Sequence, residues 1–215
     1  MMSESDYQRY LSALLAGDRQ QCTEVVFHLL KKNLDTEIIY TDLLQRSLYR
    51  IGELWAENRI SVAAEHLATA VTENILATLY PYILSNRNSL GRKAVISCSV
   101  NEYHQVGARM VADIMEAHGW DASFLGANTP AEDMLELLEE KKPEILGLSV
   151  SIYFNMSSLL KMIEKIHTHF PQLDIIVGGQ AFYWGGKDLV KDLSHVTYIP
   201  SLQSLIQTIC PEKTQ

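Results

Sequence analysis

The chain has 215 residues, 47% of them hydrophobic and 20% charged, which is the balance of a globular protein with a proper core. A net charge of -8 argues against a protein that binds nucleic acid phosphates by itself. No apolar run approaches the roughly 20 residues that a membrane-spanning helix needs. The polar N-terminus lacks the features of a signal peptide, and the three cysteines are far apart, so we expect a cytoplasmic protein without disulfides.

The N-terminal part of the chain has the spacing of amphipathic helices. Apolar residues recur there at steps of three and four, as in the run Leu44, Leu48, Ile51 and Trp55. Ser61 is placed to cap the next helix, with Glu65 close to its first turn, where a carboxylate is favoured. We predict a four-helix bundle over residues 1–86. Its helices lie near residues 5–16, 18–33, 36–56 and 61–84.

A polar, turn-forming segment follows and predicts a linker over residues 87–92. Beyond it, short apolar runs alternate with helical segments, which predicts a flavodoxin- or Rossmann-like, doubly wound α/β domain over residues 93–215. Its five parallel strands lie near residues 94–99, 122–125, 145–150, 175–177 and 196–199. Its helices lie near residues 104–118, 130–140, 155–169, 185–193 and 201–209. In such sheets ligands bind beyond the carboxyl ends of the strands.

His104 follows the first predicted strand in a pattern that suits a metal ligand. Imidazole binds transition metals well near neutral pH, and Glu102, two residues earlier, can fix the ring's tautomer and raise its basicity. Gly107, three residues later, lets a flat and bulky group approach the backbone. Taken alone, a histidine in a loop is more often a surface or capping residue.

Two further groups follow the third and fourth predicted strands. The first contains Ser149, Ser151 and Tyr153, and the second is the pair Gly178 and Gly179. Hydroxyls after a strand are as often simple helix caps, and paired glycines are as often simple turns. Because parallel strands end at one edge of the sheet, however, both groups are expected beside His104.

Together these residues resemble the cobalamin-binding domains of methionine synthase, corrinoid methyl carriers and adenosylcobalamin mutases. The family pattern is Asp-x-His-x-x-Gly, then Ser-x-Leu, then Gly-Gly; here Glu102 replaces the Asp and Ser151 replaces the Leu. The resemblance implies that His104 is the protein's cobalt ligand, in place of the dimethylbenzimidazole base. It also implies a slot for the displaced nucleotide tail, lined by the serine and floored by the glycine pair. The cobalamin-binding residues it implies here are Glu102, His104, Gly107, Ser149, Ser151, Tyr153, Gly178 and Gly179.

The predicted bundle carries a second resemblance, in Trp55 followed ten residues later by Glu65 and His66. This arrangement is similar to that of CarH-type adenosylcobalamin photoreceptors and light-responsive antirepressors, in which the Trp covers the adenosyl group and the Glu-His pair borders it. By itself, Trp55 is better explained as a core aromatic at a helix end, and His66 as a solvated residue. Ala56 stands where these photoreceptors carry a histidine that can bind cobalt after illumination, which leaves His66 or water for that position.

Three classes of function compete for this sequence. The resemblance favours a cobalamin sensor, most simply an adenosylcobalamin-binding light receptor, and the alternative is the corrinoid methyl carrier of a methyltransferase system. A flavodoxin-like module for another nucleotide is disfavoured by the three motifs together. No catalytic base or nucleophile is recognisable, so we do not expect an enzyme. About four residues precede the first predicted helix, so we expect no DNA-binding domain and a signal that passes through a protein partner, such as a transcription regulator, or through a homo-oligomer.

Overall fold

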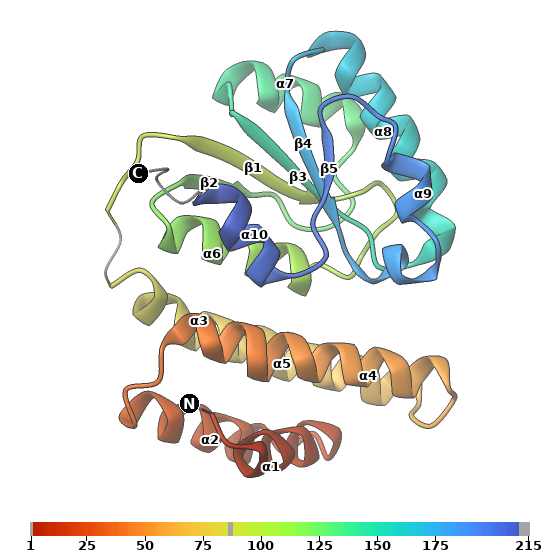
Figure 1. Ribbon diagram of the computed structural model, residues 1–215. Helices are drawn as coiled ribbons and strands as arrows, with labels where there is room; N and C mark the ends of the chain where they lie inside the picture. The colour runs from red at the N-terminus through yellow and green to blue at the C-terminus, as the bar shows by residue number, and fades with distance from the viewer. Residues whose placement is uncertain (1, 86–87, 211–215) are drawn as a thin grey trace. The chain divides into compact units, whose positions relative to one another are not determined.

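The computed structural model describes residues 2–85 and 88–210 (Figure 1). Contacts between Cα atoms divide the chain into two compact units, residues 1–85 and 86–215. The first and last residues of the predicted bundle, the first residue of the predicted linker, and residues 211–215 of the predicted second domain lie outside the described residues. No helix within the described ranges has the length and apolar character needed to cross a bilayer.

The N-terminal unit consists of the four predicted helical segments. Its elements are α1 (Glu4–Leu15), α2 (Arg19–Lys31), α3 (Thr36–Ile38), η1 (Ile39–Gln45), α4 (Arg46–Ala56) and α5 (Val62–Ile83). The elements α3, η1 and α4 follow one another without a break, so they form the single predicted helix near residues 36–56. The predicted cap is also confirmed, because the Ser61 hydroxyl accepts a hydrogen bond from the Ala64 amide at 3.2 Å.

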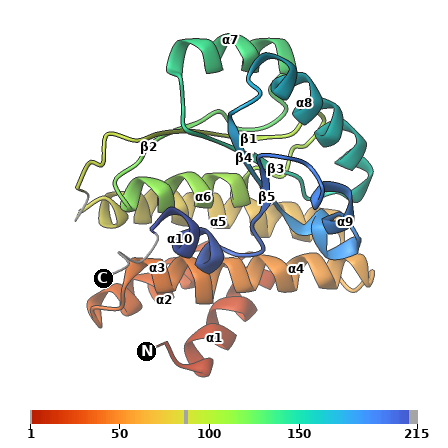
Figure 2. The same ribbon diagram turned by 45° about the horizontal axis from the view of Figure 1, so that its top comes forward.

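The second unit is a sheet of five parallel strands, as predicted. They are β1 (Lys93–Cys98), β2 (Asp121–Phe124), β3 (Ile145–Ser149), β4 (Asp174–Gly178) and β5 (Val196–Tyr198), in the order β2-β1-β3-β4-β5. The longer helices are α6 (Val106–Ala117), α7 (Ala131–Lys141), α8 (Met156–His169) and α10 (Leu202–Ile209). Helices α6 and α10 cover one face of the sheet, and α7 and α8 cover the other (Figures 1 and 2). The sheet is therefore doubly wound.

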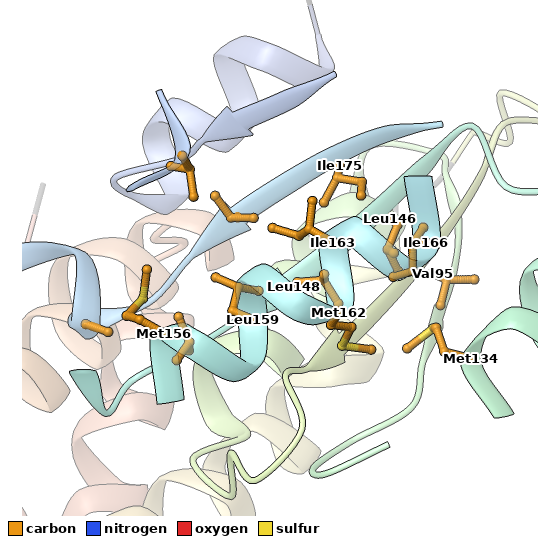
Figure 3. Close-up of a cluster of buried hydrophobic side chains, with 14 of the residues drawn as sticks. Val95, Met134, Leu146, Leu148, Met156, Leu159, Met162, Ile163, Ile166 and Ile175 are labelled. Carbon is orange, nitrogen blue, oxygen red and sulfur yellow. The ribbon is translucent and has the colours of Figure 1, made fainter. Parts of the chain in front are cut away.

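The core beneath α8 explains why the central strands are almost continuously apolar. Leu146 and Leu148 of β3 pack against Leu159 and Ile163 of α8, and all four side chains are buried (Figure 3). The opposite face of β3 is covered as well, so the strand shows no alternation of polar and apolar residues. This packing holds the carboxyl ends of the strands in fixed positions.

Two helices of the sheet unit are shorter than predicted. Helix α6 begins at Val106 rather than near 104, because the backbone N–H of His104 donates to the Glu102 carboxylate at 2.9 Å and residues 101–105 stay irregular. The helix predicted over 185–193 is only α9 (Lys187–Val190), preceded by the 3-10 turn η3 (Gln180–Trp184). Gly185 separates these two elements with a φ of 111°, which an α-helix cannot contain.

Candidate functional site

The strand order places the motifs that follow β1 and β3 at adjacent strand ends. In this sheet β1 lies between β2 and β3, so the connections after β1 and β3 leave in opposite directions and open a crevice, the usual ligand site of such folds. The register aligns Cys98 of β1 with Ser149 of β3, and Ser149 with Gly178 of β4. Loops carrying His104, Ser151 and Gly179 thus start from one edge of the sheet.

His104 is held by the carboxylate two residues before it. Its Nδ1 lies 2.6 Å from Glu102 Oε1, and its backbone N–H donates to the same oxygen. An ionised carboxylate can only accept hydrogen bonds, so Nδ1 carries the hydrogen and Nε2 bears the lone pair of the neutral ring. The side chain of His104 is 41% exposed, whereas that of Glu102 is fully buried. A fixed and accessible imidazole is suited to binding a metal ion.

The second oxygen of Glu102 is bound by the loop after β3. Glu102 Oε2 accepts hydrogen bonds from the backbone amides of Ser151 and Ile152, at 2.8 and 3.0 Å, and from Asn155 Nδ2 at 3.2 Å. Burial raises the pKa of Glu102, but the hydrogen bonds from His104 and from the two backbone amides outweigh it and lower that pKa to about 2. The carboxylate is therefore a permanent anion behind the imidazole, which it orients and makes more basic.

Sequence reasoning missed Asn101, Asn128 and Asn155. The Asn101 amide donates to Asn128 Oδ1 at 2.8 Å, and Asn155 Nδ2 donates to the Asn101 carbonyl at 3.1 Å. The backbone N–H of Asn128 in turn donates to the backbone carbonyl of Glu102 at 3.1 Å. One signal was available, since asparagine after a strand often adopts the left-handed conformation, and Asn101 and Asn128 have φ of 65° and 53°.

The glycines predicted to make room for a ligand have different surroundings. A Cβ added to Gly107 would have no atom within 4 Å, so the backbone at the start of α6 borders open space. At Gly179, with a φ of 111°, a Cβ would lie 2.1 Å from the Val150 carbonyl oxygen, so the chain's own backbone requires this glycine. At Gly178 the closest atom would be the Ile199 carbonyl oxygen, at 3.1 Å.

The residues after β3 reach the same edge in different ways. Ser149 ends the strand and is the register partner of Gly178 in β4. Because Gly178 has no side chain, the space next to Ser149 on that face of the sheet is not filled by a neighbouring Cβ. Ser151 contributes its backbone amide to Glu102, and Tyr153 begins the exposed 3-10 turn η2 (Tyr153–Asn155). All eight residues predicted in this unit thus follow or end β1, β3 or β4.

Trp55, Glu65 and His66 form a separate group in the N-terminal unit. Trp55 is 40% exposed in the last turn of α4, and the other two lie in the first turns of α5, which packs beside α4. Glu65 accepts a hydrogen bond from Thr69 Oγ1 at 3.0 Å, and its Oε2 lies 3.5 Å from Nε2 of the exposed His66. Because residues 57–61 join the two helices, these three side chains lie at one end of the bundle.

Comparison with known sequences connects both units to one cofactor. Two family models, each described as a B12 binding domain, match residues 7–80 and 92–198. The HTH-type transcriptional repressor CarH of Myxococcus xanthus is 25% identical over 180 residues, which cover 83% of this chain and 59% of the repressor. The repressor CarA of the same organism is 25% identical over 121 residues, 56% of this chain and 41% of CarA. The chain thus spans less than two thirds of either relative.

Among solved structures, the monomethylamine corrinoid protein of Methanosarcina barkeri is similar with a TM-score of 0.85. The alignment covers 96% of this chain and 98% of that protein, at 14% identity, so it concerns the fold alone. The helical unit and the sheet unit both match B12 binding domain models, and together these matches span most of the chain. The chain therefore belongs to the cobalamin-binding proteins of the B12 binding domain family.

Proposed function

We propose that this protein is a cobalamin sensor. It binds adenosylcobalamin with His104 as the protein ligand of cobalt, and it signals the state of the bound cofactor to a protein partner or through its own oligomeric state. The geometry of His104, whose Nδ1 lies 2.6 Å from a buried, ionised carboxylate while the ring remains accessible, supports the cobalt ligand. The observation that carries the sensor role is Trp55, 40% exposed beside Glu65 and His66 at one end of the bundle. Cobalamin binding follows from the family, and the sensor role is the proposed step.

The residues at this edge of the sheet suit a corrinoid. Glu102 fixes the imidazole and holds the proton on Nδ1, so Nε2 is the ring nitrogen that would bind cobalt. Open space beside Gly107 suits the approach of a wide, flat ring, and Ser149 beside Gly178 suits a narrow polar tail. When bound, an alkylcobalamin supplies a cobalt–carbon bond that light can break.

The N-terminal unit supports a sensor for the adenosyl form. An indole that is 40% exposed offers a flat apolar face, which favours stacking with an adenine ring. Glu65 and His66 add polar groups at the same end of the bundle, where they would border the adenosyl group. The similarity to CarH and CarA, both named as transcriptional repressors, supports a partner that belongs to transcription.

A corrinoid methyl carrier is the second candidate, and Ala56 is the observation that favours it. An alanine beside Trp55 cannot bind cobalt, so this position lacks the group that the photoreceptor resemblance associates with the light response. A carrier would present a methyl group to methyltransferases and would gain nothing from a tryptophan that selects adenosyl. The two candidates therefore differ in the preferred upper ligand of the cofactor.

The decisive experiment is the absorbance spectrum of the protein with adenosylcobalamin, in darkness and after green light. We expect the wild type to show histidine coordination in the dark and a spectral change with altered oligomeric state or partner binding after illumination. His104→Ala should lose histidine coordination and bind cobalamin at least tenfold more weakly, because removing even a neighbour of a metal ligand costs about 10- to 100-fold. His169→Ala, at an exposed helix end, is the matched control.

Unchanged histidine coordination in His104→Ala would refute the assignment of this ligand. If illumination changes neither the oligomeric state nor the partner binding of the complex, the light-sensing part of the proposal is refuted.

A further inference from the structure

Asn101 lies between two asparagine side chains from other loops. Its amide donates to Asn128 Oδ1 at 2.8 Å, from the loop after β2, and its carbonyl accepts from Asn155 Nδ2 at 3.1 Å, from the turn after β3. The backbone N–H and C=O of Asn101 thus both bind side chains, which are 27 and 54 positions away in sequence. We call Asn101, Asn128 and Asn155 the amide clamp.

The clamp acts on the residue that holds His104. While the Asn128 side chain binds Asn101, the Asn128 backbone N–H donates to the Glu102 carbonyl at 3.1 Å. Asn155 Nδ2 also donates to Glu102 Oε2 at 3.2 Å. Glu102 is thereby fixed at its backbone from one loop and at its carboxylate from another. Because Glu102 Oε1 lies 2.6 Å from His104 Nδ1, any movement of residues 101–102 changes the direction of the imidazole.

Two residues of the clamp have a left-handed backbone. Asn101 and Asn128 both adopt positive φ, a conformation that asparagine enters more readily than most other residues with a side chain. The hydrogen bonds with Asn128 and Asn155 hold the Asn101 backbone in this conformation. Asparagine therefore suits these positions both by its backbone preference and by the side-chain hydrogen bonds that it makes.

We propose that Asn128 and Asn155 are positioning residues for His104, acting through the backbone of Asn101 and through Glu102. The inference rests on the proposed role of His104, yet the clamp's effect on the imidazole can be measured without cofactor. Both asparagines bind Asn101 and Glu102, so their contribution is to fix the direction of the ring that Glu102 holds. Loss of either one should loosen the ring before it unfolds the protein.

The test compares two substitutions at Asn128 in the full chain. Asn128→Gly permits the positive φ but removes the side-chain acceptor, whereas Asn128→Asp keeps an acceptor of the same shape. In cofactor-free protein, NMR would follow the exchange of the His104 Nδ1 proton with water. We expect exchange to become about tenfold faster in Asn128→Gly and to stay near the wild-type rate in Asn128→Asp. Cobalamin affinity should fall about tenfold in the first variant alone, the lower end of the range for supports of a metal ligand.

Asn58→Gly is the matched control, because Asn58 has a φ of 57° but lies in the N-terminal unit. It should leave the His104 proton unchanged. Asn155→Ala gives an independent second variant with the expected loss, and combining it with Asn128→Gly should cost less than the sum of the two, since both act on Asn101.

Wild-type exchange and affinity in both Asn128→Gly and Asn155→Ala would overturn the clamp, as would an equal acceleration of His104 proton exchange in Asn58→Gly. A wild type that fails to bind cobalamin, with variants that still loosen the imidazole, would refute the proposed function and leave the clamp standing.

Discussion

At the scale of single residues, the length of Glu102 explains how one carboxylate serves two loops. Oε1 contacts His104 within its own loop, and Oε2 reaches the amides of Ser151 and Ile152 after β3. The family pattern has the shorter aspartate at this position, so Glu102 carries one methylene more than that pattern. Hydrogen bonds to a charged group contribute about 1.5–3 kcal/mol each, which makes this carboxylate a major constraint on both loops.

Sequence reasoning identified the Glu102–His104 pair because both residues lie within one short loop. It assigned Ser151 to the lining of a tail slot, which remains a prediction, and it did not foresee that the Ser151 amide binds Glu102. It also did not foresee Asn128 and Asn155. These contacts join residues 27 to 54 positions apart, and they depend on how far each loop extends beyond the sheet edge, which spacing along one strand does not encode.

Trp55 gives a prediction at the same scale. Trp55→Ala should lower the preference for adenosylcobalamin over methylcobalamin by about tenfold, because aromatic stacking and burial reward the larger upper group. Competition titrations with the two cobalamins measure this ratio. Trp184→Ala, which removes a more exposed tryptophan from the other unit, is the control and should leave the ratio unchanged. A wild type that binds both cobalamins equally would favour the methyl carrier.

At the scale of elements, the pattern of apolar residues was sufficient for strands and long helices. The strands β1, β3 and β4 are buried on both faces, so each forms a continuous apolar run that is easily recognised. The π-helical turn η1 and the 3-10 turns η2 and η3 were not foreseen. Such turns differ from an α-helix by one residue in their hydrogen bonding, and tertiary packing rather than local propensity selects them.

Two glycines at element ends should respond in opposite ways to the same substitution. Gly107→Ala should raise the free energy of unfolding by up to about 1 kcal/mol, because alanine favours a helix and its Cβ meets open space. Cobalamin affinity should nevertheless fall, since the added methyl group would occupy the space that we propose for the corrin ring. Gly179→Ala should lower the free energy of unfolding by about 2 kcal/mol or more. Alanine is strained at the φ of 111°, and its Cβ would clash with the Val150 carbonyl oxygen.

Chemical denaturation and cobalamin titration on the same preparations measure both quantities. Full cobalamin affinity in Gly107→Ala would show that the ring does not approach the start of α6. A stable Gly179→Ala would show that the backbone of β3 can move away from β4.

At the scale of the whole molecule, each unit has its own buried core. The helical unit buries apolar side chains such as Leu14, Leu29 and Leu79, and the sheet unit buries those beneath α7 and α8. Two separate cores permit one unit to change its contacts without loss of the other's fold. A ligand that favours one conformation of a unit can therefore shift that unit's population without unfolding the other.

Hydrogen exchange provides the prediction for this scale. Adenosylcobalamin in darkness should protect the amides around Trp55 and Glu65 as well as those around His104, because all three are proposed cofactor-binding residues. Green light should remove the protection around Trp55 and Glu65 and preserve it around His104. Mass spectrometry of labelled peptides separates the two regions. Protection confined to the sheet unit in darkness would contradict a role for the helical unit in sensing.

The turn η2 has one further consequence. Asn155 points inward to the carboxylate that holds the imidazole, while its neighbour Phe154 is 91% exposed. A single short turn thus joins the most enclosed group of the site to one of the most accessible side chains of the protein. An environment-sensitive dye attached at position 154 would therefore report on the hydrogen bonds around Glu102, and it would convert occupancy of the cobalamin site into an optical signal.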